Sequence, residues 1–236
     1  MKNVLVTGAS RGIGKAISQL LLLNYNVYGT ARNETLLKEL NLSDYIVCDL
    51  SIEEDLKTLS RFIVDKNIDI LVNNAGEYIY NKIEDYSYDK ISEIFKINSI
   101  APAFLISAVV PYMKANRWGR IINIGSISGV MGEACASMYS ATKASLIGLT
   151  KAVALELAQD NITINTINPG WVETELGNSS VEDSEFSKDE IIECVPQKRF
   201  VEPSEIAEMI KYLISEQAKG VTGQSINLCA GLSVGF

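Results

Sequence analysis

Residues 4–14 read VLVTGASRGIG, and this stretch decides what fold the rest of the chain is expected to have. A short β-branched run ends at Thr7, glycines follow, and an apolar helical pattern begins at Gly12. Glycines after a strand let the backbone turn tightly and approach a pyrophosphate, and the helix that follows offers free N–H groups and a positive dipole end. The stretch predicts a β–α turn that binds a dinucleotide; a glycine-rich turn without a ligand is the plainer alternative.

Short strand-like runs alternate with helical patterns along nearly the whole chain. The strand-like runs are almost continuously apolar, which is typical of a parallel sheet that helices cover on both faces. We therefore expect a single α/β domain over residues 1–236, a Rossmann-type doubly wound fold with a seven-stranded, mostly parallel sheet. The expected strands are 4–7, 26–31, 45–48, 68–73, 120–125, 162–168 and 224–229, and the expected helical regions are 12–23, 53–66, 88–115, 137–159 and 205–215.

One acidic, serine-rich segment, residues 175–196, shows no clear period of either kind. A stretch of this length without regular structure inside a compact domain is usually a functional lid or disordered. We expect an irregular loop there.

The overall charge argues against nucleic acid as a partner. The chain has 21 lysines and arginines against 29 acidic residues, a net charge of −8, and no basic run. Binding to phosphate backbones depends on clustered positive charge. The most apolar stretch, residues 100–113, contains two prolines and is expected to be too short to cross a membrane. Because the sequence shows no leader pattern, a cytoplasmic location is expected.

Histidine is absent from the chain, and cysteine is sparse. Without histidine, Ser-His-Asp and Cys-His nucleophiles are excluded, and so are nearly all histidine-ligated zinc and iron sites. The four cysteines, at positions 48, 135, 194 and 229, form no Cys-x-x-Cys pair. No metal site is expected, and isolated thiols suit a reducing compartment.

The second strand-like run leads into Arg32, at the point where a dinucleotide fold selects its cofactor. An acidic residue there binds the ribose 2′-hydroxyl of NAD, whereas an arginine accommodates the 2′-phosphate of NADP. Arg11, in the glycine-rich turn, offers a second positive charge to the same phosphate. We expect NADP(H) as the cofactor; the plainer alternative for either arginine is a solvated surface charge.

Tyr139 and Lys143 lie four residues apart in the strongest helical pattern of the chain, so their side chains share one face. A nearby ammonium is expected to lower the pKa of a tyrosine and so let it act as an acid–base group near neutral pH. On this basis activity should fall at acid pH. Ser126 follows the fifth strand-like run, where a hydroxyl could donate to a substrate carbonyl. The pattern predicts a hydride-transfer site; an amphipathic tyrosine beside a surface lysine is the alternative.

Taken together, these motifs resemble those of the short-chain dehydrogenase/reductase family, in its compact single-domain branch. In addition to the glycine-rich turn, the chain has NNAG at 73–76, KINS at 96–99 and NPGWVET at 168–174, in the order that the family has them. The resemblance covers nearly the whole chain.

The resemblance also implies a role for each motif residue. Tyr139 would protonate a carbonyl oxygen that Ser126 orients, and Lys143 would hold the nicotinamide ribose. Asn98 would hold the water of a proton relay, with a helix cap as its alternative, and Asp49 would contact the adenine or simply begin the next turn. The implied cofactor-binding residues are Gly8, Ser10, Arg11, Gly12, Ile13, Gly14, Arg32, Asp49, Leu50, Asn74, Ala75, Gly76, Tyr139, Lys143, Pro169, Gly170, Val172 and Thr174.

Within this family the chain looks most similar to the 3-oxoacyl-(acyl-carrier-protein) reductases, through IINIGS at 121–126 and GWVETE at 170–175. It departs from them at Asp160, where an arginine that docks the acidic carrier protein is common, although Arg117 keeps another such position. A net charge of −8 also opposes an acidic partner. We expect reduction of a ketone or a 3-oxoacyl thioester, free or carrier-bound.

The substrate pocket is expected to be moderately hydrophobic. The segment 175–196 should form part of it. The other side chains expected there are Tyr78, Glu133, Cys135, Met138 and Trp171.

Members of the family commonly form homo-oligomers, so the resemblance implies a tetramer or a dimer. The family's two long helices, here about 99–115 and 137–159, commonly pair between subunits. A stripe of small residues on the second helix suits close packing, although a stripe facing the core would look the same. The stripe consists of Ala141, Ala144, Gly148 and Ala152.

Two other functions stay open at this point. A cofactor-binding protein without turnover would be expected to have lost Ser126, Tyr139 or Lys143, and all three are present. An NAD-linked alcohol or hydroxy-compound dehydrogenase would differ from an NADPH-dependent reductase in its preference for the nucleotide.

Overall fold

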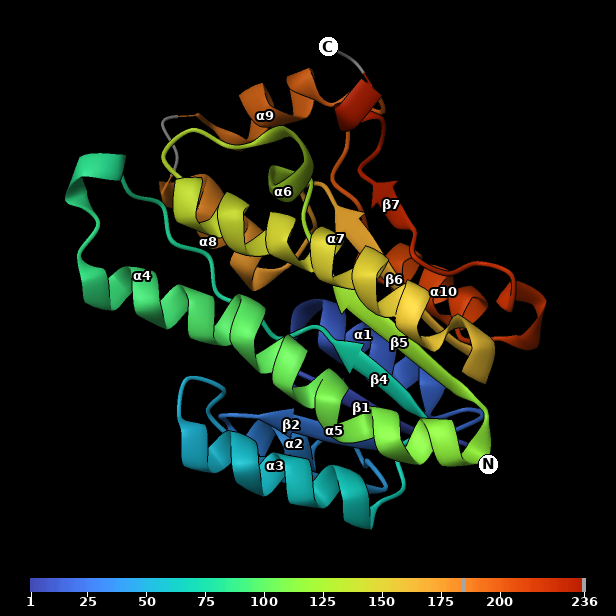
Figure 1. The fold of residues 1–236 in the computed structure, drawn as a ribbon. Helices are drawn as coiled ribbons and strands as arrows, with labels where there is room; N and C mark the ends of the chain where they lie inside the picture. Colours follow the sequence, from blue (N-terminus) through green and yellow to red (C-terminus); the bar gives the residue numbers. More distant parts are fainter. Residues whose placement is uncertain (184–185, 235–236) are drawn as a thin grey trace.

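The structure, a computed structural model, describes residues 1–183 and 186–234, which form a seven-stranded sheet with helices on both faces (Figure 1). The strand order is β3-β2-β1-β4-β5-β6-β7, and every neighbouring pair is parallel. The expected doubly wound Rossmann-type fold is confirmed. The strands are β1 (Asn3–Thr7), β2 (Asn26–Ala31), β3 (Asp44–Val47), β4 (Ile70–Asn73), β5 (Gly119–Ile124), β6 (Ile162–Pro169) and β7 (Ser225–Leu228).

Two helical layers cover the sheet, and each seals its own hydrophobic core. The central strands β4, β5 and β6 are buried along their whole length because both faces are covered. One layer contains α1 (Gly12–Leu21), α2 (Glu34–Lys38) and α10 (Pro203–Leu213), and the other contains α3 (Glu53–Asp65), α5 (Ala101–Asn116) and α7 (Ser137–Leu157). Shorter elements are α4 (Tyr88–Phe95), α6 (Ser128–Met131), α8 (Glu175–Asp183), α9 (Lys188–Cys194), a π-helical turn (Lys96–Ile100) and 3₁₀ turns at Ile83–Asp85, Ala158–Asp160, Glu216–Ala218 and Leu232–Val234.

Within the segment 175–196, residues 175–183 and 188–194 are helical, so the expectation of an irregular loop is wrong for them; residues 184–185 lie outside the described part of the chain. The Thr174 hydroxyl accepts a hydrogen bond from the Gly177 N–H at 3.0 Å in the first turn of α8, and a reciprocal capping box between Ser187 and Glu190 starts α9. Weak helix formers such as Gly177 hide the helical period in the sequence, because their propensity is low and the helices are short.

The apolar stretch identified in the sequence belongs to a longer helical run, Tyr88–Asn116, formed by α4, the π turn and α5. The run has 29 residues and contains an 18-residue window with a mean hydropathy of 1.6, so by length and composition alone it could span a membrane. The length argument from the sequence is therefore insufficient, because the helix continues through both prolines. In the fold the run packs against α3 and α7, as a core helix does.

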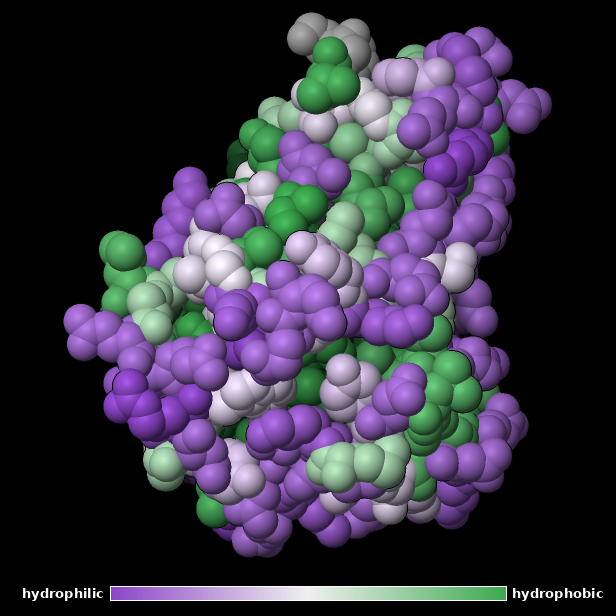
Figure 2. All heavy atoms as spheres, turned by 90° about the vertical axis from the view of Figure 1, so that its right-hand side faces the viewer, coloured by the Kyte–Doolittle hydropathy of each residue, from purple (hydrophilic) through white to green (hydrophobic). Residues whose placement is uncertain are grey.

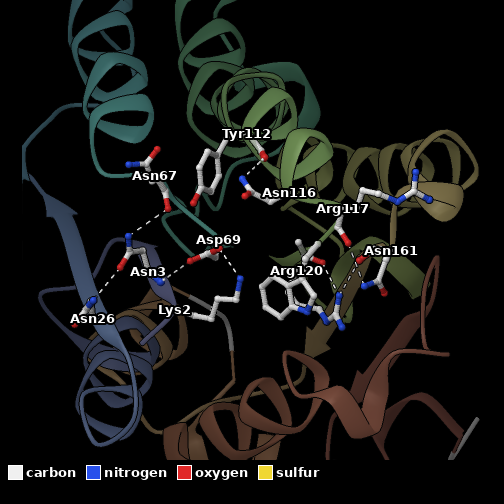
Figure 3. A network of polar contacts seen from close by, with 12 residues as sticks. Lys2, Asn3, Asn26, Asn67, Asp69, Tyr112, Asn116, Arg117, Arg120 and Asn161 are labelled. Atoms are coloured by element: carbon white, nitrogen blue, oxygen red, sulfur yellow. Dashed lines mark hydrogen bonds and ion pairs between the residues drawn. The ribbon is translucent and has the colours of Figure 1, made fainter.

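A polar network holds the amino ends of the strands, at the edge opposite to their carboxyl ends (Figure 3). Asp69, just before β4, accepts hydrogen bonds from the Lys2 ammonium and from the Asn3 N–H, both at 2.9 Å. Arg120, at the start of β5, is fully buried. Its guanidinium stacks on the Trp118 ring at 4.5 Å and forms an ion pair with the exposed carboxylate of Glu216. The Arg120 backbone N–H also donates to the Asp69 carbonyl at 3.2 Å, so these contacts tie β1, β4 and β5 together at one end.

The outer edge of β7 ends the sheet, and Figure 2 views the molecule from this side. Hydrophilic side chains cover most of the surface in this view, and hydrophobic ones form patches between them, one in the upper half and one at the lower right. Val234 is among the exposed hydrophobic residues.

Candidate active site

The carboxyl ends of β1, β4, β5 and β6 border a cavity of about 560 Å³. The strand order reverses between β1 and β4, which is where doubly wound sheets bind ligands. Gly14 and Asn98 lie behind the wall of the cavity, and the other residues that the sequence singled out for catalysis or cofactor binding line it. They are Gly8, Ser10, Arg11, Gly12, Ile13, Arg32, Asp49, Leu50, Asn74, Ala75, Gly76, Ser126, Tyr139, Lys143, Pro169, Gly170, Val172 and Thr174.

The glycine-rich turn has a geometry that only glycine accepts easily. Gly8 and Gly12 have φ values of +63° and +52°. A Cβ on Gly14 would lie 2.1 Å from the Gly8 carbonyl oxygen, so a side chain there would push α1 away from the turn. The side-chain amide of Asn74 donates to the carbonyls of Thr7 at 2.8 Å and Gly8 at 3.2 Å, which fixes the turn from the β4 side.

The N-terminus of α1 fits an anionic group. Its cap residue, Arg11, makes no side-chain capping bond, so in the described part of the chain no side-chain cap satisfies the first-turn N–H groups. These N–H groups, the positive end of the helix dipole and the glycine backbone together form a cradle of the kind that binds phosphate.

Two arginines border this end of the cavity. Arg32 is exposed there, whereas Arg11 lies 3.4 Å from the carboxylate of Glu175 in α8. Asp49 lines the same end, and its side chain also accepts two hydrogen bonds from Ser51, so it does begin the turn into α3. Burial would raise the pKa of Asp49, but these bonds and the charge of Arg32 hold it below its ordinary value.

Ser126, Tyr139 and Lys143 meet at the opposite end of the cavity. The Tyr139 side chain is hydrogen-bonded to Ser126, and the Lys143 ammonium lies 5.7 Å from the centre of the Tyr139 ring. Lys143 is buried and donates to the Ile124 carbonyl at 2.8 Å. The i, i+4 spacing on α7 thus places both side chains beside the end of β5, as the sequence indicates.

The electrostatics of Tyr139 differ from the expectation. Burial raises its pKa to about 12, the hydrogen bond with Ser126 lowers it, and the carboxylate of Glu133 raises it. Burial also lowers the pKa of Lys143 to about 8. The predicted lowering of the Tyr139 pKa by Lys143 is therefore wrong for this structure: the net shift is upward, and burial of the phenol is its largest cause. At neutral pH Tyr139 holds its proton and is poised to act as an acid.

Asn98 lies inside the helical run, in the π turn Lys96–Ile100, so its alternative role as a helix cap is wrong. Its side chain accepts from the Glu77 N–H at 2.9 Å and donates to the Glu77 carbonyl at 2.8 Å and to the Thr142 hydroxyl at 3.1 Å. A Cβ on Gly76 would lie 3.1 Å from the Lys143 ammonium and 3.3 Å from the Asn98 carbonyl oxygen. The π turn thus places Asn98 directly behind Lys143.

A model of the short chain dehydrogenase family matches residues 2–185. The chain belongs to the short-chain dehydrogenase family. It is accordingly an oxidoreductase.

Relatives extend over the full length of this short-chain dehydrogenase. The 3-oxoacyl-(acyl-carrier-protein) reductase FabG of Staphylococcus epidermidis is 36% identical, with 98% of each chain aligned. A variant of actinorhodin polyketide ketoreductase with NADPH has a TM-score of 0.93 at 36% identity and covers 99% of this chain and 97% of its own. A putative NAD(P)-dependent gluconate 5-dehydrogenase from Beutenbergia cavernae with bound NADP has a TM-score of 0.91 at 28% identity and covers 98% and 96%.

The substrate end of this short-chain dehydrogenase contains a cluster that the sequence did not predict as a unit: Tyr78, Ser128 and Glu133. The Tyr78 hydroxyl donates to Glu133 at 2.7 Å, and the Ser128 hydroxyl donates to its other oxygen at 2.5 Å. No local pattern links a residue after β4 to the segment after α6, so only the fold reveals the contact.

Of the five side chains predicted to line the substrate pocket, three are confirmed and two are not. Tyr78, Glu133 and Trp171 line the cavity, whereas Cys135 and Met138 lie outside its lining. The backbone carbonyl of Cys135 instead accepts a hydrogen bond from the segment after β4. The helix α8 also contributes side chains to the lining of the cavity, among them Leu176 and Ser180.

Proposed function

We propose that this short-chain dehydrogenase is an NADP(H)-dependent reductase of ketones or 3-oxoacyl thioesters. The observation that carries the proposal is that Ser126, Tyr139 and Lys143 share one cavity with an uncapped, glycine-built helix N-terminus. The reductases among its relatives support the same class of reaction. A protein that only binds the cofactor would not need the three polar side chains assembled in this way.

The residues at the phosphate end fit NADP(H). The cradle at α1 would take the pyrophosphate, and Arg32, exposed at the cavity, would take the 2′-phosphate. Arg11 would reach the same phosphate by giving up its ion pair with Glu175. Because both side chains of this pair are exposed, the pair contributes little to stability and is easily broken. When bound, the reduced nicotinamide supplies a hydride to the carbonyl carbon.

Side chains of the protein orient the carbonyl oxygen of the substrate and supply its proton. Ser126, whose hydroxyl donates to Ser128 in the free protein, turns its one proton to the carbonyl oxygen and so orients it, and Tyr139 gives that oxygen a proton as negative charge develops. The Lys143 ammonium stabilises the phenolate that remains and holds the nicotinamide ribose. Asn98, fixed behind Lys143 by its hydrogen bonds to Glu77 and Thr142, holds the water through which Tyr139 regains a proton.

Carbonyl reduction is expected to be nearly constant from pH 6 to about 7, to be about half lost near pH 8 and to fall further at higher pH. Tyr139, with a pKa of about 12, stays protonated in this range, whereas Lys143 loses its charge as the pH rises through about 8. Activity is thus expected to fall on the alkaline side, whereas the sequence predicts a fall on the acid side. The check is kcat/KM for reduction from pH 6 to 10; a loss confined to the acid side would contradict it.

Replacing Arg32 by aspartate is expected to reverse the nucleotide preference, lowering kcat/KM for NADPH relative to NADH by about 10²-fold, because the charge that receives the 2′-phosphate changes sign. The measurement compares the two nucleotides in wild-type and R32D protein. Arg61→Asp, which makes the same charge change on α3 outside the cavity, is the control. An unchanged preference in R32D would refute the cofactor assignment.

The finer proposal is a 3-oxoacyl thioester, whose carrier would dock beside the end of α5. Arg117 is exposed there in a left-handed conformation and donates to the Gln159 carbonyl at 3.0 Å. Asp160 lies 3.9 Å from Lys114, so a negative charge occupies part of this face. A panel of simple ketones, free 3-oxoacyl thioesters and carrier-bound ones, followed by loss of NADPH absorbance, tests the class and the carrier together.

A second candidate is oxidation of a hydroxy compound. The similarity to the gluconate 5-dehydrogenase structure favours it, because the same side chains serve both directions of hydride transfer. The same panel run with alcohols and the oxidised nucleotide distinguishes the two candidates.

A homo-oligomer, a tetramer or a dimer, is the proposed assembly. The small-residue stripe of α7 faces outward, and a Cβ on Gly148 would meet no atom within 4 Å, so the alternative of a core-facing stripe does not apply. Exposed apolar side chains accompany it, with Leu155 85% and Ile100 55% exposed. The unpaired edge of β7 offers a second surface.

We place the enzyme in the cytoplasm. All four cysteines are free thiols, and Cys48 and Cys229 are buried. Burial raises the pKa of Cys48 to about 12, so it is an unreactive core thiol suited to a reducing compartment.

A further inference from the structure

Glu133 places a carboxylate at the substrate end of the cavity. Its two oxygens accept hydrogen bonds from Tyr78 and Ser128, both neutral donors. Within residues 1–183 and 186–234, no lysine or arginine pairs with it. The side chain is half-buried, so solvent screens its charge less than it would at the surface.

The charge of Glu133 acts on the reacting groups. The Ser126 hydroxyl donates to Ser128 at 3.1 Å, and Ser128 donates to Glu133, so a chain of hydrogen bonds leads from the carboxylate to the catalytic serine. The Tyr78 ring meets the Tyr139 ring edge-on, with centroids 5.0 Å apart. Glu133 also contributes to raising the pKa of Tyr139, which places the tyrosine hydroxyl within range of its field.

We propose that Glu133 is a specificity-determining residue that selects carbonyl substrates according to their charge. Compounds that are neutral near the reacting carbonyl, or carry a hydrogen-bond donor or cation there, are accepted; compounds with a carboxylate there are rejected. The inference rests on the proposed carbonyl reduction and deepens it.

The physical basis is repulsion of like charges in a partly desolvated space. A substrate held by Ser126 and Tyr139 places its neighbouring atoms beside the Ser128–Glu133 pair. A carboxylate on one of those atoms meets a second negative charge with little water between them, whereas an ester or thioester does not. Tyr78 and Ser128 hold the carboxylate in place, so it cannot swing into solvent without losing two hydrogen bonds.

The test uses acetoacetate and ethyl acetoacetate, which share the reacting ketone and differ in charge beside it. We expect wild-type protein to prefer the ester, and Glu133→Gln, which keeps the shape, to reduce the ester-to-acid ratio of kcat/KM at least about tenfold. Glu133→Asp keeps the charge and should preserve most of the ratio. Glu84→Gln, an equal charge change on an exposed residue outside the cavity, should leave it unchanged. A purely structural role would lower both rates alike; an unchanged ratio in E133Q overturns the proposal.

Failure of the proposed function gives a different result. If wild-type protein oxidises NADPH with neither compound, carbonyl reduction of this class is refuted, and binding tests the charge selection by itself. Trp171 lines the cavity and Trp118 lies at the opposite edge of the sheet, so tryptophan fluorescence reports ligands at the site. In Tyr139→Phe protein the ester should bind more tightly than the acid, and the added E133Q change should remove the difference. Equal binding in both proteins overturns the proposal.

Discussion

Replacement of Tyr139 by phenylalanine should lower kcat for carbonyl reduction by about 10²- to 10⁴-fold, the usual contribution of a positioned acid–base group. The change removes only the hydroxyl that is hydrogen-bonded to Ser126, while the ring keeps its edge contact with Tyr78. The affinity for NADPH should therefore change by no more than about threefold, because the phosphate end is untouched. Steady-state turnover and nucleotide binding by fluorescence measure the two quantities separately.

Tyr88→Phe is the matched control, since Tyr88 is 82% exposed at the start of α4 and lies outside the cavity. It should retain full activity. If Y139F protein kept more than about a tenth of the wild-type rate, another group would be donating the proton and the proposed mechanism would be wrong.

Gly14→Ala should unfold the phosphate end of the protein. The added Cβ would lie 2.1 Å from the Gly8 carbonyl oxygen and 2.8 Å from the Gly8 carbonyl carbon, backbone atoms that cannot yield cheaply, and 2.6 Å from the Asn74 side-chain nitrogen. We expect a loss of about 3 kcal/mol in the free energy of unfolding, which corresponds to a Tm lower by roughly 6–12 °C, and loss of measurable NADPH binding.

Gly220→Ala provides the comparison, because a Cβ there meets no atom within 4 Å. Thermal unfolding of both variants, with and without NADPH, checks the prediction. A G14A protein that unfolds at the wild-type temperature and is stabilised by NADPH as wild type is would contradict it.

The sequence predicts the fold well where one local signal decides the structure. The glycines of the first turn are needed for its backbone angles, and the i, i+4 spacing of Tyr139 and Lys143 needs only that their segment be helical. Short apolar runs between turn signals are sufficient to place the strands, because helices cover both faces of the sheet, although β6 buries polar side chains such as Asn165 and the edge strands β3 and β7 are only partly buried.

What the sequence does not predict depends on tertiary contacts. The helices α8 and α9 are short and depend on hydrogen bonds at their N-termini, and α8 also contains weak helix formers, so their period is faint. The pKa of Tyr139 follows from how far the fold removes its side chain from solvent, which spacing alone does not reveal. Glu133 is visible as an acidic residue, but its two partners come from segments 55 and 5 residues away.

The polar network at the amino ends of the strands, which includes the Lys2–Asp69 and Arg120–Glu216 pairs, bears on how such an enzyme diversifies. Because the strands are fastened at one rim, the loops at the other rim are released from the task of keeping the sheet in register. Substitutions around Glu133 or in α8 can then alter what is recognised while the scaffold tolerates them. One architecture can in this way be retuned to new compounds by changes confined to a single side of the molecule.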